Sequence, residues 1–241
     1  MLKIKSRYKP LYKKFVRLRK NIQNKKKVNL LKFTSKKWKN LNSFLSRQIN
    51  RKKKNYRSYD LDSVFIKRFG NFHKRKFLLK LLNKQSFSLF YGSLKNKSLK
   101  KLISLSSRKG KIHKEYTKNH ILNKLESRLD TVLYRSHFVK SFREARYLLK
   151  HGHILLNGHK VTNCDYLLQK GDLIYVSPSI RKHIKNNLLS SNMWPIPPEN
   201  IVLDYNLLNI IYLDNNQTNY FYNKFPFYIN LDDIIRYYTK N

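Results

Sequence analysis

The 241-residue sequence is poor in acidic residues and has a single cysteine and a single alanine. The lone cysteine, Cys164, excludes a disulfide within the chain and any zinc site built from cysteines. No apolar run reaches the length of a membrane-spanning helix, so we expect no membrane partner. The few carboxylates are scattered, and we interpret them as helix caps and ion-pair partners. Because no catalytic set, metal cluster or glycine-rich phosphate loop is present, we expect no enzyme activity, cofactor or metal.

The charge that remains is strongly positive. Lys and Arg number 53 against 13 Asp and Glu, which gives a formal net charge of +40. Nucleic acid is the expected partner, because each phosphate that a cation neutralises releases condensed counterions. An anionic membrane surface is the alternative polyanion. An AT-rich genome would explain the excess of lysine and asparagine, but not the shortage of acids, so we interpret the charge as functional.

The pattern along the chain predicts an α+β protein. We expect a mostly helical basic domain, a small domain of two helices on a short β-sheet, and a C-terminal strand-and-helix segment that returns to the helical domain. The expected regions are a basic arm (1–57), a helical domain (58–126), a small α+β domain (127–188), and C-terminal strands and helix (189–241).

Two details of this division depend on composition. Gly92 is expected to separate two helices of the helical domain, and the polar stretch 106–120 is interpreted as a linker. The first twenty residues are as basic and acid-free as an import presequence, but we interpret them as a retained RNA-binding arm.

The small domain carries the clearest local signals. A second helix is expected after Ser141, whose hydroxyl should accept from the Glu144 amide while the Glu144 carboxylate accepts from the Ser141 amide. Gly152 is expected to end this helix, and Asn157-Gly158 predicts a type I′ hairpin turn. The apolar faces of the two helices are expected to contain Leu129, Val132, Leu133, Phe142, Ala145, Leu148 and Leu149.

Cationic residues follow the same two helices at helical spacing. Because the apolar faces should pack on the sheet, we expect the arginines to point outward and line one groove, where guanidinium groups suit phosphate. Imidazole and amide groups of the hairpin suit ribose and base edges. A solvated helix face is the alternative interpretation. The predicted RNA-binding residues are Arg128, Arg135, Lys140, Arg143, Arg146, Lys150, His151, His153, Asn157, His159 and Lys160 in the small domain, and Arg7, Lys9, Lys13, Lys14, Arg17 and Arg19 in the arm.

Residues 128–161 resemble the RNA-binding domain first defined in the ribosomal protein S-four family of the small subunit. The matching pieces are Arg128-Leu129-Asp130, Tyr134-Arg135, Arg143-Glu144-Ala145-Arg146, Leu148-Leu149, His151-Gly152-His153-Ile154, Asn157-Gly158 and Val161. The stretch "LLNKQSFSLFYGSL" is similar to the family's helical-domain signature, in which a Lys-Gln pair precedes Tyr-Gly-x-Leu. The basic start and the closing "LDDIIRYY" also look like the family's. The chain departs from some bacterial members by lacking N-terminal zinc-binding cysteines, and its region before residue 70 is longer.

This resemblance implies a structural constituent of the small ribosomal subunit. Its expected partners are the small-subunit rRNA, bound early in assembly, the neighbouring small-subunit proteins, and mRNA where it enters the subunit. The lysine- and asparagine-rich, alanine-poor composition suits an organelle-encoded copy, mitochondrial more than plastid.

Two alternatives use the same small domain. A pseudouridine synthase would need a separate catalytic domain with an active aspartate, for which the acid-poor flanks are too short. A free RNA-binding regulator or ribosome-associated factor would separate from the small subunit at high salt.

Overall fold

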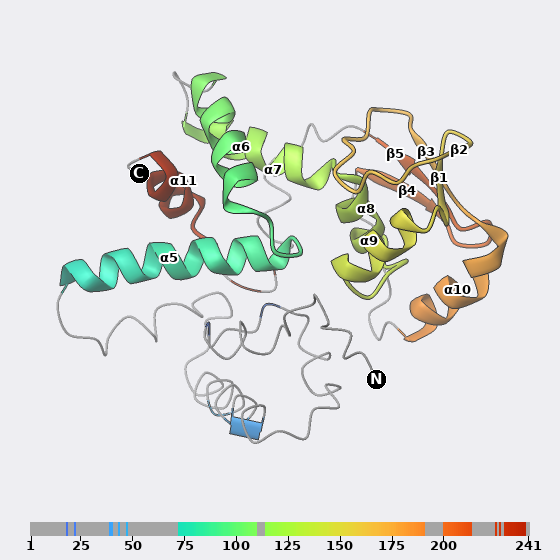
Figure 1. Cartoon of the computed structure of the whole chain (residues 1–241), viewed down its shortest axis with the longest axis horizontal. Coiled ribbons are helices and arrows are strands. Elements are labelled where there is room, and N and C mark those ends of the chain that lie inside the picture. Colours follow the sequence, from blue (N-terminus) through green and yellow to red (C-terminus); the bar gives the residue numbers. More distant parts are fainter. Residues whose placement is uncertain are drawn as a thin grey trace, which may run out of the picture. The chain divides into compact units, whose positions relative to one another are not determined.

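The computed structural model describes residues 72–109, 114–190, 200–213, 225, 227 and 229–239, together with Leu18, Ile22, Lys39, Asn40, Ser43 and Arg47. The chain forms two compact units, Met1–Phe90 with Lys224–Asn241, and Tyr91–Asn223. Helices and an antiparallel sheet are both present, which confirms the α+β class (Figure 1). Within the described part of the chain, every helix is too short or too polar to cross a lipid bilayer.

In the first unit, helix α5 (Phe72–Phe90) packs against helix α11 (Leu231–Thr239), which lies far from it in the sequence. The buried side of α11 carries Leu231 and Ile234. The Lys84 ammonium of α5 lies 4.3 Å from the ring centroid of Tyr237 in α11, within the range of a cation–π interaction. The closing helix therefore returns to the helical domain, as the sequence predicts.

The second unit begins with two helices, α6 (Asn96–Lys109) and α7 (Lys114–Glu126). The expected break at Gly92 is confirmed, since α5 ends at Phe90 and Gly92 has a positive φ of 72°. The expected linker over 106–120 is wrong, because both helices extend into it. Ser106 is fully buried, and its hydroxyl lies 2.8 Å from the Leu102 carbonyl and 2.9 Å from His120 Nδ1. The hydroxyl of Ser106 is thus satisfied inside the helix pair, by a carbonyl of its own helix and by His120 of α7.

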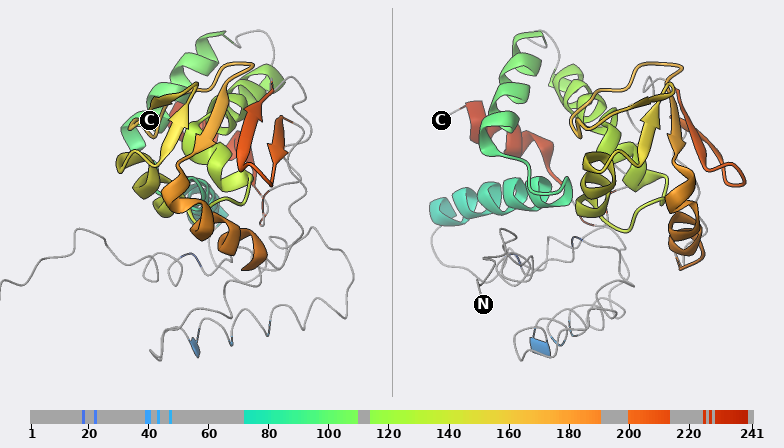
Figure 2. Two further views of the ribbon diagram at one scale, coloured as in Figure 1. Left: turned by 90° about the vertical axis from the view of Figure 1, so that its right-hand side faces the viewer. Right: turned by 45° about the vertical axis from the view of Figure 1, so that its right-hand side comes forward.

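The rest of this unit is a five-stranded antiparallel sheet with helices on one face (Figure 2). The strand order is β2-β1-β3-β5-β4. The strands are β1 (Ile154–Leu156), β2 (His159–Lys160), β3 (Leu173–Val176), β4 (Ile201–Asp204) and β5 (Asn209–Tyr212). The helices are α8 (Leu129–Arg135), α9 (Phe142–Lys150), the 3-10 turn η1 (Pro178–Ile180) and α10 (Arg181–Ser190).

The strands expected after the proline-rich stretch extend this same sheet. Ile210 of β5 pairs with Ile174 of β3, and Leu203 of β4 pairs with Ile210. The C-terminal segment is thus shared between the two units, with its strands in the second and α11 in the first. The sequence does not indicate this split.

The core of the second unit lies between the sheet and helices α8, α9 and α10. All seven residues predicted for the apolar helix faces are buried, with exposed fractions of at most 6%. The sheet contributes inward-facing residues of alternate positions, such as Ile154, Leu156, Ile174 and Val176. The periodicity of the two helices therefore predicts correctly which side faces the sheet.

Of the two hydrogen bonds predicted for the start of α9, one is present. The Ser141 hydroxyl accepts from the Glu144 amide at 3.2 Å. The Glu144 carboxylate accepts from the Lys140 amide at 2.7 Å, one residue earlier than the Ser141 amide that the sequence predicts. The reciprocal bond of a capping box is therefore displaced by one residue, which corrects that prediction.

The hairpin turn has the expected geometry, with φ of 49° at Asn157 and 85° at Gly158. The Asn157 side chain also ties this turn to the segment before β3. Its amide nitrogen donates to Asp172 Oδ1 at 2.9 Å, and its oxygen accepts from the Leu173 amide at 2.9 Å. Asn157 therefore has a structural role that the sequence prediction of an RNA contact does not include.

We predict that Asn157→Ala destabilises the second unit. Alanine disfavours a positive φ and loses both side-chain hydrogen bonds, so the free energy of unfolding should fall by about 1–3 kcal/mol. Gln169→Ala is the matched control, because Gln169 is exposed and donates only its backbone amide to Asp172. Urea unfolding of both variants checks the prediction, and equal losses would contradict it.

Candidate nucleic-acid interface

Arg128 and Arg146 meet at one buried carboxylate. Asp130, whose side chain is 0% exposed, accepts from Arg128 Nε and Nη2 at 3.0 and 2.8 Å and from Arg146 Nε at 2.9 Å. The same Nη2 of Arg128 also donates to Asp165 Oδ1 at 2.5 Å. Burial lowers the pKa of Arg128, but its bonds to Asp130 and its attraction to both carboxylates outweigh this and raise the pKa above the ordinary value. The Arg128 guanidinium is therefore held as a cation inside the fold.

Arg146 also fixes the turn that follows α5. Its Nη1 donates to the Gly92 carbonyl at 2.7 Å, and its Nη2 donates to the Tyr91 carbonyl at 2.9 Å. A Cβ atom on Gly92 would lie 2.8 Å from Arg146 Nη2 and 2.9 Å from Phe142 Cβ. The Tyr-Gly pair of the helical signature thus needs glycine both for its positive φ and for the close approach of Arg146.

Arg135 lies in a second buried network. Its Nη2 and Nε donate to the two oxygens of Glu126 at 2.7 and 3.0 Å, and the Tyr91 hydroxyl donates to Glu126 Oε1 at 2.7 Å. Burial, with the Glu126 charge adding to it, raises the pKa of Tyr91 well above its ordinary value, so the phenol remains a donor. Burial lowers the pKa of Arg135, but Glu126 more than compensates, and the net shift is upward.

These networks change the assignment of the arginine stripe. The expectation that the arginines point outward along one groove is wrong for Arg128, Arg135 and Arg146. Arg128 caps α8 from an extended conformation and pairs with Asp130 two positions later. Arg135 of α8 and Arg146 of α9 are drawn inward by carboxylates of other helices, Glu126 of α7 and Asp130 of α8. The scattered acids are ion-pair partners, as expected, and Glu126 and Asp130 are the main ones.

Glu144 joins α9 to α10 in a third set of contacts. His183 Nε2 lies 2.8 Å from Glu144 Oε1, and Asn187 Nδ2 donates to the same oxygen at 3.0 Å. Partial burial raises the pKa of Glu144, but the bonds from His183, the Lys140 amide and Asn187 outweigh it and leave the pKa below its ordinary value. Glu144 therefore acts as a structural anion.

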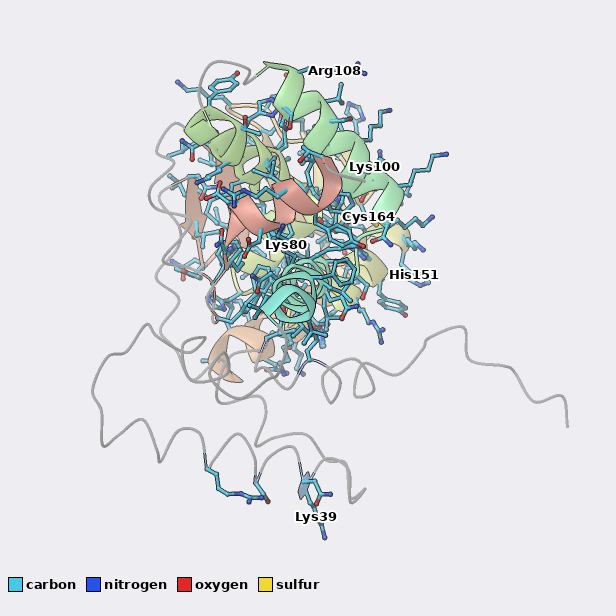
Figure 3. All side chains as sticks on the ribbon, turned by 90° about the vertical axis from the view of Figure 1, so that its left-hand side faces the viewer. Lys39, Lys80, Lys100, Arg108, His151 and Cys164 are labelled. Carbon is cyan, nitrogen blue, oxygen red and sulfur yellow. The ribbon has the colours of Figure 1, made fainter. Side chains whose placement is uncertain are left out.

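The other predicted residues of this domain lie nearer the surface. Lys140, Lys150, His151, Asn157, His159 and Lys160 are exposed, and Arg143 and His153 are partly buried. Most of them surround the C-terminal end of α9 and the β1–β2 hairpin. Figure 3 shows His151 at the outer edge of this part of the molecule. The predicted arm residues Arg7, Lys9, Lys13, Lys14, Arg17 and Arg19 lie outside the described residues.

One residue that the sequence analysis does not select completes this surface. Tyr147 is 57% exposed, and its ring centroid lies 4.2 Å from that of His151. The sequence does contain a sign of this pair. Tyr147 precedes His151 by four residues, so the two rings are expected on the same side of the helix end. We call Tyr147, Lys150, His151, His153 and Lys160 the hairpin surface.

Comparison with known proteins agrees with these features. Residues 127–174 match the S4 domain family. The small ribosomal subunit protein uS4 of Aquifex aeolicus is 36% identical over 166 residues, which cover 67% of this chain and 74% of that protein. The small ribosomal subunit protein uS4m of Reclinomonas americana is 30% identical over 180 residues, covering 70% of this chain and 68% of that protein.

The shared region extends well beyond the S4 domain in both relatives. The matched domain and the two relatives therefore point to the same family. The chain therefore belongs to the uS4 family of small ribosomal subunit proteins.

Proposed function

We propose that this chain is a structural, rRNA-binding component of the small ribosomal subunit. The observation that supports this most strongly is its similarity to uS4 proteins over two thirds of the chain, since those proteins are named for that subunit. The net charge of +40 agrees with an RNA partner. The role is one of binding and scaffolding, and no enzymatic step is assigned to it.

The finer parts of the proposal concern place and timing. We propose that the chain joins the rRNA early in assembly, contacts neighbouring small-subunit proteins and borders the channel through which mRNA enters. We also propose a mitochondrial ribosome, which the similarity to the Reclinomonas uS4m protein and the alanine-poor composition support. Fractionation of the source cells tests this location, because the chain should be recovered with mitochondrial small subunits.

The proposed RNA contacts are the polar residues nearer the surface rather than the three arginines held in ion pairs. Lys150 and Lys160 of the hairpin surface are the main candidates, with Lys140, Arg143, His151, His153 and His159 around them. The arm residues named above stay part of the proposal because of their charge. Arg128, Arg135 and Arg146 are proposed to act indirectly, by fixing the helices that carry this surface.

Salt dependence tests this electrostatic interface. The affinity of the full chain for a small-subunit rRNA transcript should fall steeply with salt, with a log–log slope of about −0.9 per phosphate bound on duplex regions. In Lys150→Gln/Lys160→Gln the slope should become shallower by about 0.9 for each phosphate that is no longer neutralised. The control pair Lys170→Gln/Lys182→Gln is also exposed but lies outside the hairpin surface. A slope near zero for the parent, or a larger change in the control pair, would contradict the proposal.

A further inference from the structure

Three aromatic rings gather where α9 ends and β1 begins. The Tyr147 and His151 centroids are 4.2 Å apart with an angle of 51° between the rings. His151 and His153 are 6.2 Å apart with an angle of 30°. Tyr147 is 57% exposed and His151 is exposed, so both side chains are accessible to a partner. Accessible aromatic rings that lie beside lysines are the arrangement on which unpaired bases stack.

The backbone holds these rings in a fixed arrangement. Gly152 adopts a φ of 69°, and its amide donates to the Leu149 carbonyl at 3.0 Å. The His153 amide donates to the Leu148 carbonyl at 3.0 Å, which completes a Schellman motif at the helix end. The His153 carbonyl accepts from the Ser177 amide at 2.9 Å, beside the sheet. The backbone that carries these rings is therefore already ordered, and binding of a partner costs little conformational entropy here.

Positive charge flanks the rings. Lys150 and Lys160 are both exposed, and Lys160 Cδ lies 3.5 Å from the position that a Cβ on Gly152 would take. The Lys160 side chain therefore runs along the turn between His151 and His153. A helix C-terminus carries partial negative charge, so its backbone does not attract phosphate, and the two lysines must supply the attraction for an anionic partner.

We propose that Tyr147, His151 and His153 form a stacking platform for an unpaired base of the small-subunit rRNA, with Lys150 and Lys160 on the flanking phosphates. This inference rests on the proposed function. Bases in an A-form duplex are stacked on one another and present no free face, whereas unpaired bases of loops and bulges stack on aromatic side chains. In such a nucleotide, the base can stack on the rings while the lysines contact its phosphates.

A salt titration with a leucine variant tests the platform. Tyr147→Leu keeps an apolar side chain of good helix propensity but removes the flat ring. Its affinity for a small-subunit rRNA transcript should fall about 5- to 150-fold at every salt concentration, because stacking is not a phosphate contact. The log–log salt slope should therefore stay that of the parent. Tyr147→Phe should restore the affinity to within about twofold, since it keeps the ring.

Tyr116→Leu is the matched control. Tyr116 is 49% exposed on α7, and its ring lies 6.0 Å from that of His120, but it lies outside the hairpin surface. This variant should bind as the parent does. Circular dichroism confirms that each variant is folded.

The outcomes separate this inference from the proposed function. If the parent binds the transcript and Tyr147→Leu binds equally well, the platform is overturned and the proposed function stands. A changed salt slope in Tyr147→Leu would also overturn it, since the variant would then neutralise fewer phosphates. Normal transcript binding with failed incorporation into subunits would assign the rings to a protein neighbour instead. A parent that does not bind the transcript contradicts the proposed function itself.

Discussion

Replacing Asp130 with alanine should lower the free energy of unfolding by about 3–5 kcal/mol, because it leaves buried charges without their main partner. The carboxylate is fully buried and accepts from both Arg128 and Arg146. The side chains of these arginines are only 10% and 26% exposed, so water cannot replace the lost acceptor fully. The loss should appear in urea unfolding of the full chain followed by circular dichroism.

Asp165 offers a matched control for this variant. It contacts the same guanidinium group of Arg128, but its own side chain is 72% exposed. An exposed ion pair typically contributes about 0–1 kcal/mol, so Asp165→Ala should change stability little. Similar losses in the two variants would show that burial does not determine the strength of this network. A stable Asp130→Ala would release both arginines for the outward role that the sequence suggests.

The second large effect is expected for Glu126→Met. This change removes the acceptor of the buried Arg135 guanidinium and of the Tyr91 hydroxyl, and it should lower the free energy of unfolding by about 3–5 kcal/mol. The double variant Glu126→Met/Arg135→Met should recover most of this loss, because apolar side chains of similar size can replace a buried ion pair. Adding Tyr91→Phe removes the hydroxyl that donates to Glu126 in the parent chain.

A double-mutant cycle on Glu126 and Arg135 separates this structural role from RNA contact. A large coupling energy in the unfolding of the free protein is the expected result. If Arg135→Met left stability unchanged and lowered rRNA affinity, Arg135 would be an RNA contact after all, and its pairing with Glu126 would be incidental.

Local sequence signals predict the local structure of the second unit well. The Asn157-Gly158 turn, the Ser141 cap and the buried helix faces all depend on residues within a few positions of one another, and all three are present. Short-range rules suffice there because the interacting groups are fixed by one element's geometry.

The same reasoning fails where partners are distant in sequence. Arg146 and Asp130 are 16 positions apart on different helices, and the Arg146 contacts with Tyr91 and Gly92 span 55 and 54 positions. Spacing along one helix shows which side an arginine occupies, but not whether a carboxylate or a carbonyl of another element lies there. The pairing of β5 with β3 is not predicted for the same reason, since the residue pattern of one strand does not show which strand lies beside it.

The sequence also predicts only part of the hairpin surface. The histidines and lysines are evident as polar candidates for RNA contact, but the sequence pattern gives Tyr147 as one more apolar residue of an amphipathic helix. Only the fold shows that it lies outside the buried stripe of Phe142, Ala145, Leu148 and Leu149, beside His151. An aromatic residue just over one turn before a helix-ending glycine is the feature that a second reading of the sequence would examine.

Sedimentation of the native particle tests the central claim most directly. Ribosomes from the source cells are separated into subunits on a sucrose gradient at high salt, and the chain is detected in each fraction. A structural component of the small subunit should remain with that subunit at high salt, because contacts enclosed on assembly are screened less than the exposed contacts that give transcript binding its salt dependence. Recovery of the chain in the soluble fractions at the top of the gradient, with small subunits that are otherwise complete, would contradict the account and favour a free RNA-binding factor.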